Sequence, residues 1–158
     1  MVRVVPSRLT GGSAADEEDD SAEFDVDGRG VQDLHLKVLI IEDSLDTLNM
    51  LKLWLTTFGC EVSTATEAME GISIATGHPP DLIISDIGMP DVDGYELIRV
   101  VRKTAGLEHV PAIALTGYAR DEDRELALSA GYNAHISKPA NIGRLLYLIK
   151  KLTRDRQQ

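Results

Sequence analysis

From residue 37 onward, short apolar runs alternate along the chain with segments that have a helical spacing of apolar residues. The runs with strand character span Lys37–Ile41, Glu61–Ala65, Asp81–Ser85, Ala112–Leu115 and Ala134–Ser137. Several of them are almost continuous in valine, isoleucine and leucine, as expected for strands that are buried on both faces. The pattern therefore predicts a parallel β-sheet whose two faces are both covered.

The segments between these runs have the spacing of amphipathic helices. They span Asp46–Phe58, Glu67–Thr76, Gly94–Thr104, Asp121–Ala130 and Ile142–Leu152. The first ends just before Gly59, where a helix that stops often has a residue in the left-handed conformation. The strict alternation of five strands and five helices predicts an α/β fold that is built from βαβ units.

Residues 1–35 differ from the rest of the chain in composition. They hold nine acidic and three basic side chains and few large apolar ones. Such a segment buries too little apolar surface to offset the entropy lost when its backbone is ordered. We expect an acidic, disordered tail over residues 1–35, one domain over 36–153 and a short C-terminal tail over 154–158. A linker that remains from a longer parent protein is an alternative interpretation of the acidic tail.

The formal net charge of −10 limits the partners that the protein can have. The sequence has no basic stripe that would neutralise nucleic-acid phosphates, so we expect no nucleic-acid binding. The single cysteine, Cys60, cannot form an internal disulfide, and the apolar runs are too short for a membrane span or a signal peptide. We therefore expect a cytoplasmic protein without membrane association, whose acidic surface favours a divalent cation and a basic protein partner.

Polar side chains follow four of the five predicted strands at their carboxyl ends. Glu42 and Asp43 follow the first strand, Asp86 the third and Thr116 the fourth, and Lys138 lies just beyond the fifth. Ligands of an open parallel sheet bind at the carboxyl ends of its strands. We therefore expect these side chains to converge at one edge of the sheet.

This set of residue types has a specific chemistry. Three carboxylates that lie close together are unfavourable unless a cation neutralises them. Oxygen ligands without histidine or cysteine suit a hard ion such as Mg²⁺. A carboxylate nucleophile, a metal ion and a lysine are the groups that phosphoryl transfer to an aspartate requires. The alternative is a salt-bridge network of surface acids without chemical function.

Four segments around these residues resemble the receiver domains of two-component response regulators and hybrid histidine kinases. They are Val38–Asp43 (VLIIED), Ile83–Gly94 (IISDIGMPDVDG), Pro111–Gly117 (PAIALTG) and Ser137–Pro139 (SKP). They occur in the order of that family and at its approximate spacings, and the resemblance covers residues 37–152. It implies a flavodoxin-like, doubly wound sheet of five parallel strands in the order 2-1-3-4-5 with five helices.

The resemblance also implies a role for the acids and the lysine. Asp86 matches the aspartate that accepts a phosphoryl group from a histidine kinase or a histidine phosphotransfer protein and that also binds Mg²⁺. Asp43 matches a direct ligand of Mg²⁺, Glu42 a ligand through water, and Gly88 the residue whose backbone carbonyl is a further ligand. Lys138 matches the lysine that holds a phosphoryl oxygen.

The remaining matched positions concern the response to phosphorylation. Thr116 matches the hydroxyl that moves to bond the phosphoryl group, and His135 matches the switch residue that fills the space it leaves. A histidine that only packs is the alternative interpretation of His135. Tyr118 and Gly88 occupy positions at which the family tunes hydrolysis of the acyl phosphate. The Lys138–Pro139 bond is expected to be cis.

We therefore expect a phosphoacceptor that catalyses its own phosphorylation and dephosphorylation and signals to a downstream protein, not an enzyme that acts on a separate substrate. A single-domain response regulator is favoured, and the terminal receiver of a split or truncated hybrid histidine kinase is the alternative. A pseudo-receiver that only scaffolds is disfavoured. So is a haloacid-dehalogenase-like phosphatase: the segment Asp91–Gly94 superficially resembles its nucleophile motif, but Met89 and Pro90 separate that segment from the strand. We expect Asp91 to lie in a turn and Asp93 to cap a helix.

Overall fold

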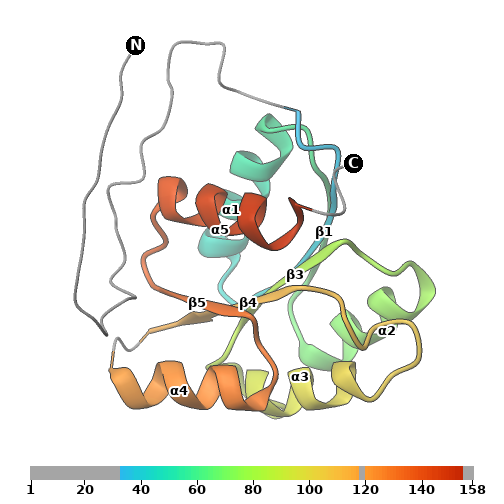
Figure 1. Cartoon of the computed structure of the whole chain (residues 1–158), viewed down its shortest axis with the longest axis vertical. Coiled ribbons are helices and arrows are strands. Elements are labelled where there is room, and N and C mark those ends of the chain that lie inside the picture. Colours follow the sequence, from blue (N-terminus) through green and yellow to red (C-terminus); the bar gives the residue numbers. More distant parts are fainter. Residues whose placement is uncertain (1–32, 118–119, 155–158) are drawn as a thin grey trace.

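The structure, a computed structural model, describes residues 33–117 and 120–154, and its elements alternate as predicted (Figure 1). The strands are β1 (Lys37–Ile41), β2 (Glu61–Ala65), β3 (Leu82–Asp86), β4 (Ala112–Thr116) and β5 (Ala134–Ser137). The helices are α1 (Leu45–Thr57), α2 (Ala68–Gly77), α3 (Gly94–Arg102), α4 (Asp121–Ala130) and α5 (Ile142–Leu152). The predicted boundaries are correct to within two residues, and the largest difference is the end of α3, at Arg102 instead of Thr104.

The strands form one parallel sheet in the order β2-β1-β3-β4-β5, which confirms the flavodoxin-like, doubly wound arrangement. The pairs at the carboxyl ends of the strands are Ile41 with Ser85, Asp86 with Leu115, and Thr116 with Ser137. This register brings the ends of the three central strands and of β5 to a common edge. The polar residues that follow these strands therefore lie at that edge.

Helices cover both faces of the sheet, with α1 and α5 on one face and α2, α3 and α4 on the other (Figure 1). Successive residues of the central strands divide between two apolar clusters because strand side chains alternate in direction. Ile40 and Ile84 belong to the cluster with α1 and α5, whereas Leu39 and Ile83 belong to the cluster with the other helices. All four side chains are at most 1% exposed. Burial on both faces accounts for the continuous apolar runs in the sequence.

Local signals in the sequence account for several helix ends. Ser44 precedes α1 and its side chain accepts a hydrogen bond from the Thr47 backbone N–H. Asn141 precedes α5 and accepts from the Arg144 N–H in the same way. Gly59 follows α1 with a φ of 86°, in the left-handed region that the sequence predicted for it. These caps satisfy backbone groups that a helix end leaves without intrahelical partners.

The packed part of the chain begins before the first strand. Leu34 is 4% exposed, and its backbone N–H donates to the Phe58 carbonyl at 2.9 Å. The expected end of the acidic tail, at residue 35, lies one residue beyond this buried leucine. Residues 1–32 of that tail, residues 155–158 of the C-terminal tail and Tyr118 lie outside the described residues.

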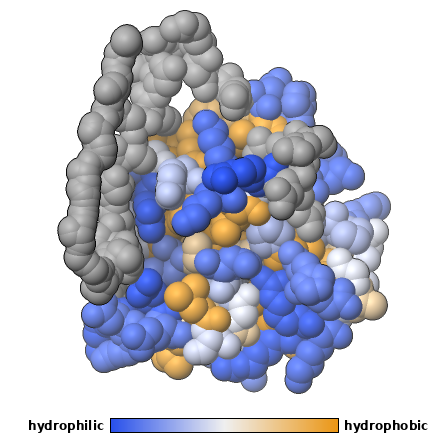
Figure 2. Space-filling model, in the orientation of Figure 1, coloured by the Kyte–Doolittle hydropathy of each residue, from blue (hydrophilic) through white to orange (hydrophobic). Residues whose placement is uncertain are grey.

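The described surface mixes hydrophilic and apolar residues. On the face seen in Figure 2, hydrophilic residues cover most of the described atoms and apolar residues show in groups between them. The large apolar side chains with the greatest exposure are Leu53, Met69 and Leu45, at 66%, 61% and 60%. Among the helices in the described ranges, none has both the length and the apolar character that crossing a membrane requires.

Candidate functional site

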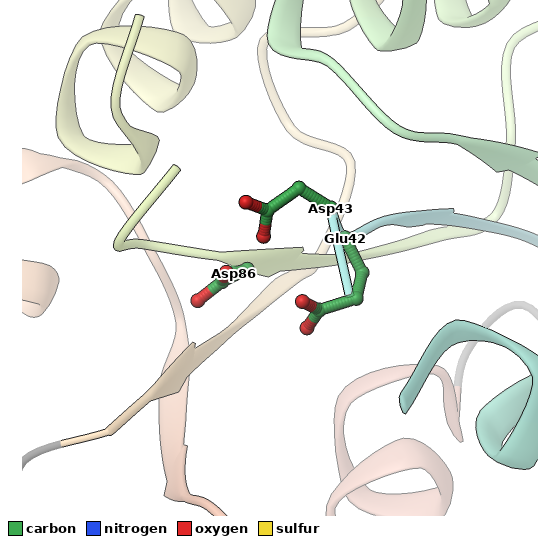
Figure 3. Close-up of side chains that lie close together, drawn as sticks. All are labelled: Glu42, Asp43 and Asp86. Atoms are coloured by element: carbon green, nitrogen blue, oxygen red, sulfur yellow. The ribbon is translucent and has the colours of Figure 1, made fainter. Parts of the chain in front are cut away.

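Three carboxylates meet where the ends of β1 and β3 lie side by side. Glu42 and Asp43 follow β1, Asp86 is the last residue of β3, and each offers an oxygen within 4.8 Å of the others. Figure 3 shows the Glu42 and Asp43 side chains leaving the chain in opposite directions, with Asp86 beside them. The sheet register causes this proximity, because Ile41 lies opposite Ser85 and the next residue of each strand is acidic.

The three acids differ in their contact with solvent. Glu42 is completely buried and Asp86 is 5% exposed, whereas Asp43 and Gly88 are exposed. The Gly88 backbone N–H donates to Asp86 Oδ1 at 3.2 Å. A Cβ built on Gly88 would meet only that oxygen, 4.0 Å away, so the site is uncrowded on this side.

Lys138 is shared between two of the acids. Its Nζ lies 3.0 Å and 3.2 Å from the two Glu42 carboxylate oxygens and 3.4 Å from Asp86 Oδ1. Its backbone N–H donates to the Thr116 carbonyl at 2.8 Å, which fixes the start of the β5–α5 connection against the end of β4. The Lys138–Pro139 bond is cis, as expected. The sequence predicted that the lysine would join the acids, but not that Glu42 would be its nearer partner.

Burial and charge act in opposite directions on this pair. Burial raises the pKa of the Glu42 carboxyl, and so does the charge of Asp86. The Ser44 backbone N–H, which donates to Glu42 at 2.9 Å, and Lys138 lower this pKa but do not offset burial, so it lies above its ordinary value. Burial lowers the pKa of Lys138, but its bond to Glu42 and the charge of Asp86 outweigh burial, so this pKa lies above its ordinary value. Lys138 is therefore positively charged at neutral pH.

The donor set suits a divalent metal ion with oxygen ligands. One lysine faces three carboxylates, so the ionised cluster keeps a negative charge that a divalent cation can neutralise. Within the described ranges, the buried Glu42 Oε1 accepts no hydrogen bond, although Lys138 Nζ lies 3.0 Å away. Carboxylate oxygens without histidine or cysteine are the ligands that Mg²⁺ prefers. The acid cluster can therefore hold a metal ion of this kind.

The two predicted switch residues lie on β4 and β5. Thr116 is the last residue of β4 and is 4% exposed. His135 on β5 is half-buried, and its buried Nε2 has no hydrogen-bond partner among the residues that the structure describes. Burial lowers the pKa of His135, as do Arg124 and Arg144, while Asp123 raises it. The charges that act on His135 thus come from α4 and α5 and not from the acid cluster.

The two acids of the β3–α3 connection have structural roles, as predicted. Asp93 caps α3, and its Oδ1 accepts from the Tyr95 and Glu96 backbone N–H groups at 3.0 Å each. Asp91 is exposed and has a φ of 66°, a conformation found in turns. Neither belongs to the acid cluster.

Two buried residues next to Asp86 were not predicted from the sequence. Ser85 is completely buried, and its Oγ donates to the Asp86 carbonyl at 3.1 Å. Tyr132 is 3% exposed, and its hydroxyl donates to the Gly94 carbonyl at 2.8 Å. Two features of the sequence could have indicated them: a serine inside an otherwise apolar strand and a tyrosine just before another strand. A buried hydroxyl needs a hydrogen-bond partner, so both residues are candidates for contacts near the strand ends.

The sequence has relatives among known regulators. It matches the response regulator receiver domain family over residues 38–150. An uncharacterised 14.6 kDa protein of Leptolyngbya boryana is 40% identical over 116 residues, which cover 73% of this chain and 88% of that protein. The polar-differentiation response regulator DivK of Brucella ovis is 32% identical over 118 residues, which cover 75% of this chain and 96% of DivK.

Solved structures give the same result. The receiver domain of the sensor histidine kinase PA1611 from Pseudomonas aeruginosa PAO1, solved with a magnesium ion coordinated in its active site cleft, is 28% identical with a TM-score of 0.71. The match covers 76% of this chain and 98% of that domain. Sequence match, strand order and structural likeness agree, and the chain belongs to the response regulator receiver domain family of two-component signalling.

Proposed function

We propose that the protein is a phosphorelay receiver that accepts a phosphoryl group on Asp86 from a histidine kinase or a histidine phosphotransfer protein. The observation that carries this proposal is the position of Asp86, which has oxygens of Glu42 and Asp43 within 4.8 Å and the Nζ of Lys138 at 3.4 Å. A carboxylate held between a lysine and an acid cluster that suits a metal ion can attack phosphorus and then carry the group. Membership of the receiver family supports the same assignment.

The proposed metal is Mg²⁺. Asp43, Asp86 and the backbone carbonyl of Gly88 would hold it directly, and Glu42 would hold it through water. When bound, the ion neutralises charge that develops on the transferred phosphoryl group. The magnesium ion in the cleft of the PA1611 receiver supports this choice.

The chain's own residues carry out the transfer. A carboxylate oxygen of Asp86 attacks phosphorus, and the new P–O bond forms while the P–N bond to the partner's phosphohistidine breaks. The imidazole leaves with the electron pair of that bond. Lys138 holds a phosphoryl oxygen, and its raised pKa keeps it charged for this role. Glu42 positions Lys138, because its Oε2 accepts from the ammonium group and is itself held by the Ser44 backbone N–H. Hydrolysis of the resulting acyl phosphate would return the domain to its starting state.

Phosphorylation would change the surface through β4 and β5. In this proposal Thr116 bonds the phosphoryl group, and His135 fills the space that Thr116 leaves. His135 Nε2 has no hydrogen-bond partner in the described part of the chain, so rotation of the ring would break no hydrogen bond at this atom. This supports a ring that can move. The change would select one of two packings around α4, β5 and α5 and alter contacts with a downstream protein target.

The relatives support two settings for such a domain. DivK is named a response regulator and is matched over 96% of its length, which supports a single-domain regulator. The PA1611 domain belongs to a sensor histidine kinase, which supports a kinase-linked receiver as the second candidate. We favour the single-domain regulator, in the cytoplasm, with neither nucleic acid nor membrane as partner.

We place the domain over residues 34–153, because Leu34 and Thr153 are both buried, with a short tail after it and the acidic tail before it.

The test is intact-mass spectrometry of the full chain after incubation with Mg²⁺ and acetyl phosphate or phosphoramidate. One added phosphoryl group is expected, and none is expected without Mg²⁺ or in Asp86→Ala. Asp91→Ala is the matched control, because Asp91 is an exposed acid outside the cluster and its loss should leave the adduct unchanged. If no adduct forms, binding of beryllofluoride by the parent chain would support a receiver with rapid hydrolysis, whereas absence of that binding would overturn the proposal.

A further inference from the structure

A buried tyrosine lies directly behind the end of β3. The Tyr132 hydroxyl donates to the carbonyl of Gly94, the first residue of α3, at 2.8 Å. Ser85, the residue before Asp86, lies close enough to the same hydroxyl to lower its pKa, and its Oγ donates to the Asp86 carbonyl at 3.1 Å. The phenol oxygen therefore binds the first residue of α3 and lies near Ser85, at the end of β3.

This connection carries the backbone part of the proposed metal site. Residues 87–93 join β3 to α3 and include Gly88. The Gly94 N–H donates to the Ile87 carbonyl at 3.0 Å, which joins the first residue of α3 to the first residue after β3. A Cβ built on Gly94 would lie 2.7 Å from the Asp86 carbonyl oxygen and 3.1 Å from the Tyr132 hydroxyl. Only glycine permits this contact between the start of α3 and the end of β3, and the Tyr132 hydroxyl lies beside it.

The hydrogen bonds in this group depend on the phenol remaining protonated. Burial raises the pKa of Tyr132 far above its ordinary value, and the nearby Asp86 acts in the same direction. The phenol hydrogen is donated to the Gly94 carbonyl, and the single hydrogen of Ser85 is donated to the Asp86 carbonyl. Removal of the phenol oxygen would leave the Gly94 carbonyl, at the start of α3, without this donor.

We propose that Tyr132 is a positioning residue for the divalent-ion site. Its hydroxyl, bonded to the Gly94 carbonyl where the start of α3 meets the end of β3, sets the path of residues 87–93 and thereby the position of the Gly88 carbonyl relative to Asp86. Tyr132 touches neither the ion nor the phosphoryl group and acts only through the backbone and Ser85. This inference rests on the proposed function, because it adds a supporting residue to the same site.

The test is the Mg²⁺ affinity of Tyr132→Phe, a variant that removes the hydroxyl and keeps the ring. Isothermal titration calorimetry of the full chain is made at a temperature at which circular dichroism shows the variant to be fully folded. We expect the Mg²⁺ dissociation constant to rise about tenfold, the lower end of the effect found for groups that orient metal ligands. The backbone amide resonance of Gly88 should also shift.

Two further variants distinguish positioning from a general loss of stability. Tyr147→Phe removes a hydroxyl from a tyrosine that is 48% exposed on α5, and its Mg²⁺ affinity should equal that of the parent. Ser85→Ala removes the second hydroxyl of the group. Because Tyr132 and Ser85 act on one segment, their effects on Mg²⁺ affinity should not add in the double variant.

The outcomes separate this inference from the proposed function. If the parent binds Mg²⁺ and folded Tyr132→Phe binds it equally well, the positioning role is overturned and the proposed function is unaffected. A lower melting temperature of Tyr132→Phe with unchanged Mg²⁺ affinity would also overturn the positioning role. If the parent chain binds neither Mg²⁺ nor beryllofluoride, both the proposed function and the role of Tyr132 are overturned.

Discussion

Glu42 has no exposed surface, yet two further carboxylates have oxygens within 4.8 Å of it. Lys138 offsets part of this negative charge and is itself shared with Asp86. Like charges that are close together and partly buried raise the free energy of the folded state. At the scale of single residues, the acid cluster therefore costs stability that a bound cation would restore.

Removal of the Asp43 charge should stabilise the protein when no divalent ion is present. We expect Asp43→Asn to raise the free energy of unfolding in EDTA by about 1 kcal/mol, the energy of two unit charges roughly 4 Å apart in water. Saturating Mg²⁺ should reverse the order, because Mg²⁺ at about 100 times its dissociation constant stabilises the parent by about 2.7 kcal/mol. Urea unfolding with and without Mg²⁺ measures both effects.

Asp46→Asn is the control for this change, since Asp46 is an exposed acid on α1 outside the cluster. Its effect on stability should be the same in EDTA and in Mg²⁺. An Asp43→Asn variant that is less stable than the parent in EDTA would show that repulsion within the cluster is not significant.

His135 should make stability depend on pH in a defined direction. Burial, Arg124 and Arg144 lower the pKa of His135 below 6.5, so the unfolded chain binds a proton more readily than the folded chain. Stability from this group is present above the unfolded pKa and is lost as pH falls from that pKa through the lower pKa of the folded state, by at most about 1.4 kcal/mol for each pH unit. Urea unfolding of the parent and of His135→Phe should therefore show a smaller loss for the variant between neutral pH and about pH 5.

The exposed His109 provides the comparison, and His109→Phe should keep the pH dependence of the parent. A parent and a His135→Phe variant that lose equal stability on acidification would contradict the prediction. Asp123 opposes the two arginines at His135, so Asp123→Asn should increase the pH dependence.

At the scale of the elements, α1 and α3 begin with caps of different quality. Asp93 accepts two backbone hydrogen bonds at 3.0 Å, whereas Ser44 accepts one at 3.4 Å. We expect Asp93→Ala to lower the free energy of unfolding by about 1–2 kcal/mol and Ser44→Ala by about 0.5 kcal/mol. Asp93→Asn keeps an acceptor and should recover most of the loss in urea unfolding. Equal losses in the two alanine variants would show that cap geometry does not determine the difference.

The order of elements could be predicted from apolar spacing alone, but their ends depend on side-chain contacts that spacing does not encode. The predicted third strand began at Asp81, yet β3 begins at Leu82. The Asp81 carboxylate instead accepts from the Lys37 backbone N–H at 2.8 Å. The predicted third helix ended at Thr104, yet α3 ends at Arg102, whose side chain reaches the connections that follow α3 and α4.

At the scale of the whole molecule, the members of the acid cluster could be predicted because parallel strands end at a common edge. Their pairing could not be predicted, since it depends on register and side-chain direction. Lys138 lies nearer to Glu42 than to Asp86 for this reason. Tyr132 was missed because it is 38 residues from Gly94 in the sequence, and only the fold brings its hydroxyl there.

Arg102 joins parts of the molecule that are distant in the sequence. Its guanidinium group donates to the carbonyl oxygens of Leu107, Glu108, Val110 and Gly131 and to the Asn133 side chain. The same Asn133 oxygen accepts from the Ala112 backbone N–H at 2.8 Å, at the start of β4. One side chain thus holds the α3–β4 and α4–β5 connections together.

Loss of Arg102 should therefore weaken the whole fold and not only α3. Arg102→Met keeps an apolar stem but removes every donor, and several partly buried carbonyl groups then lose their partner. We expect a loss of about 3 kcal/mol in the free energy of unfolding, since each buried polar group without a partner costs about 1–3 kcal/mol. Arg102→Lys should recover less than half, because an ammonium group cannot reproduce the planar fork of a guanidinium.

Arg99→Met is the matched control on the same helix, since Arg99 is exposed and its loss should change stability by no more than about 0.5 kcal/mol. Urea unfolding gives the energies, and hydrogen exchange at the Ala112 amide tests the proposed route. That amide should exchange faster in Arg102→Met, because the Asn133 oxygen that it bonds would lose its second partner. If Arg102→Met were as stable as Arg99→Met, the two connections would be held by backbone contacts alone, and the hydrogen bonds of Arg102 would follow from the fold without supporting it.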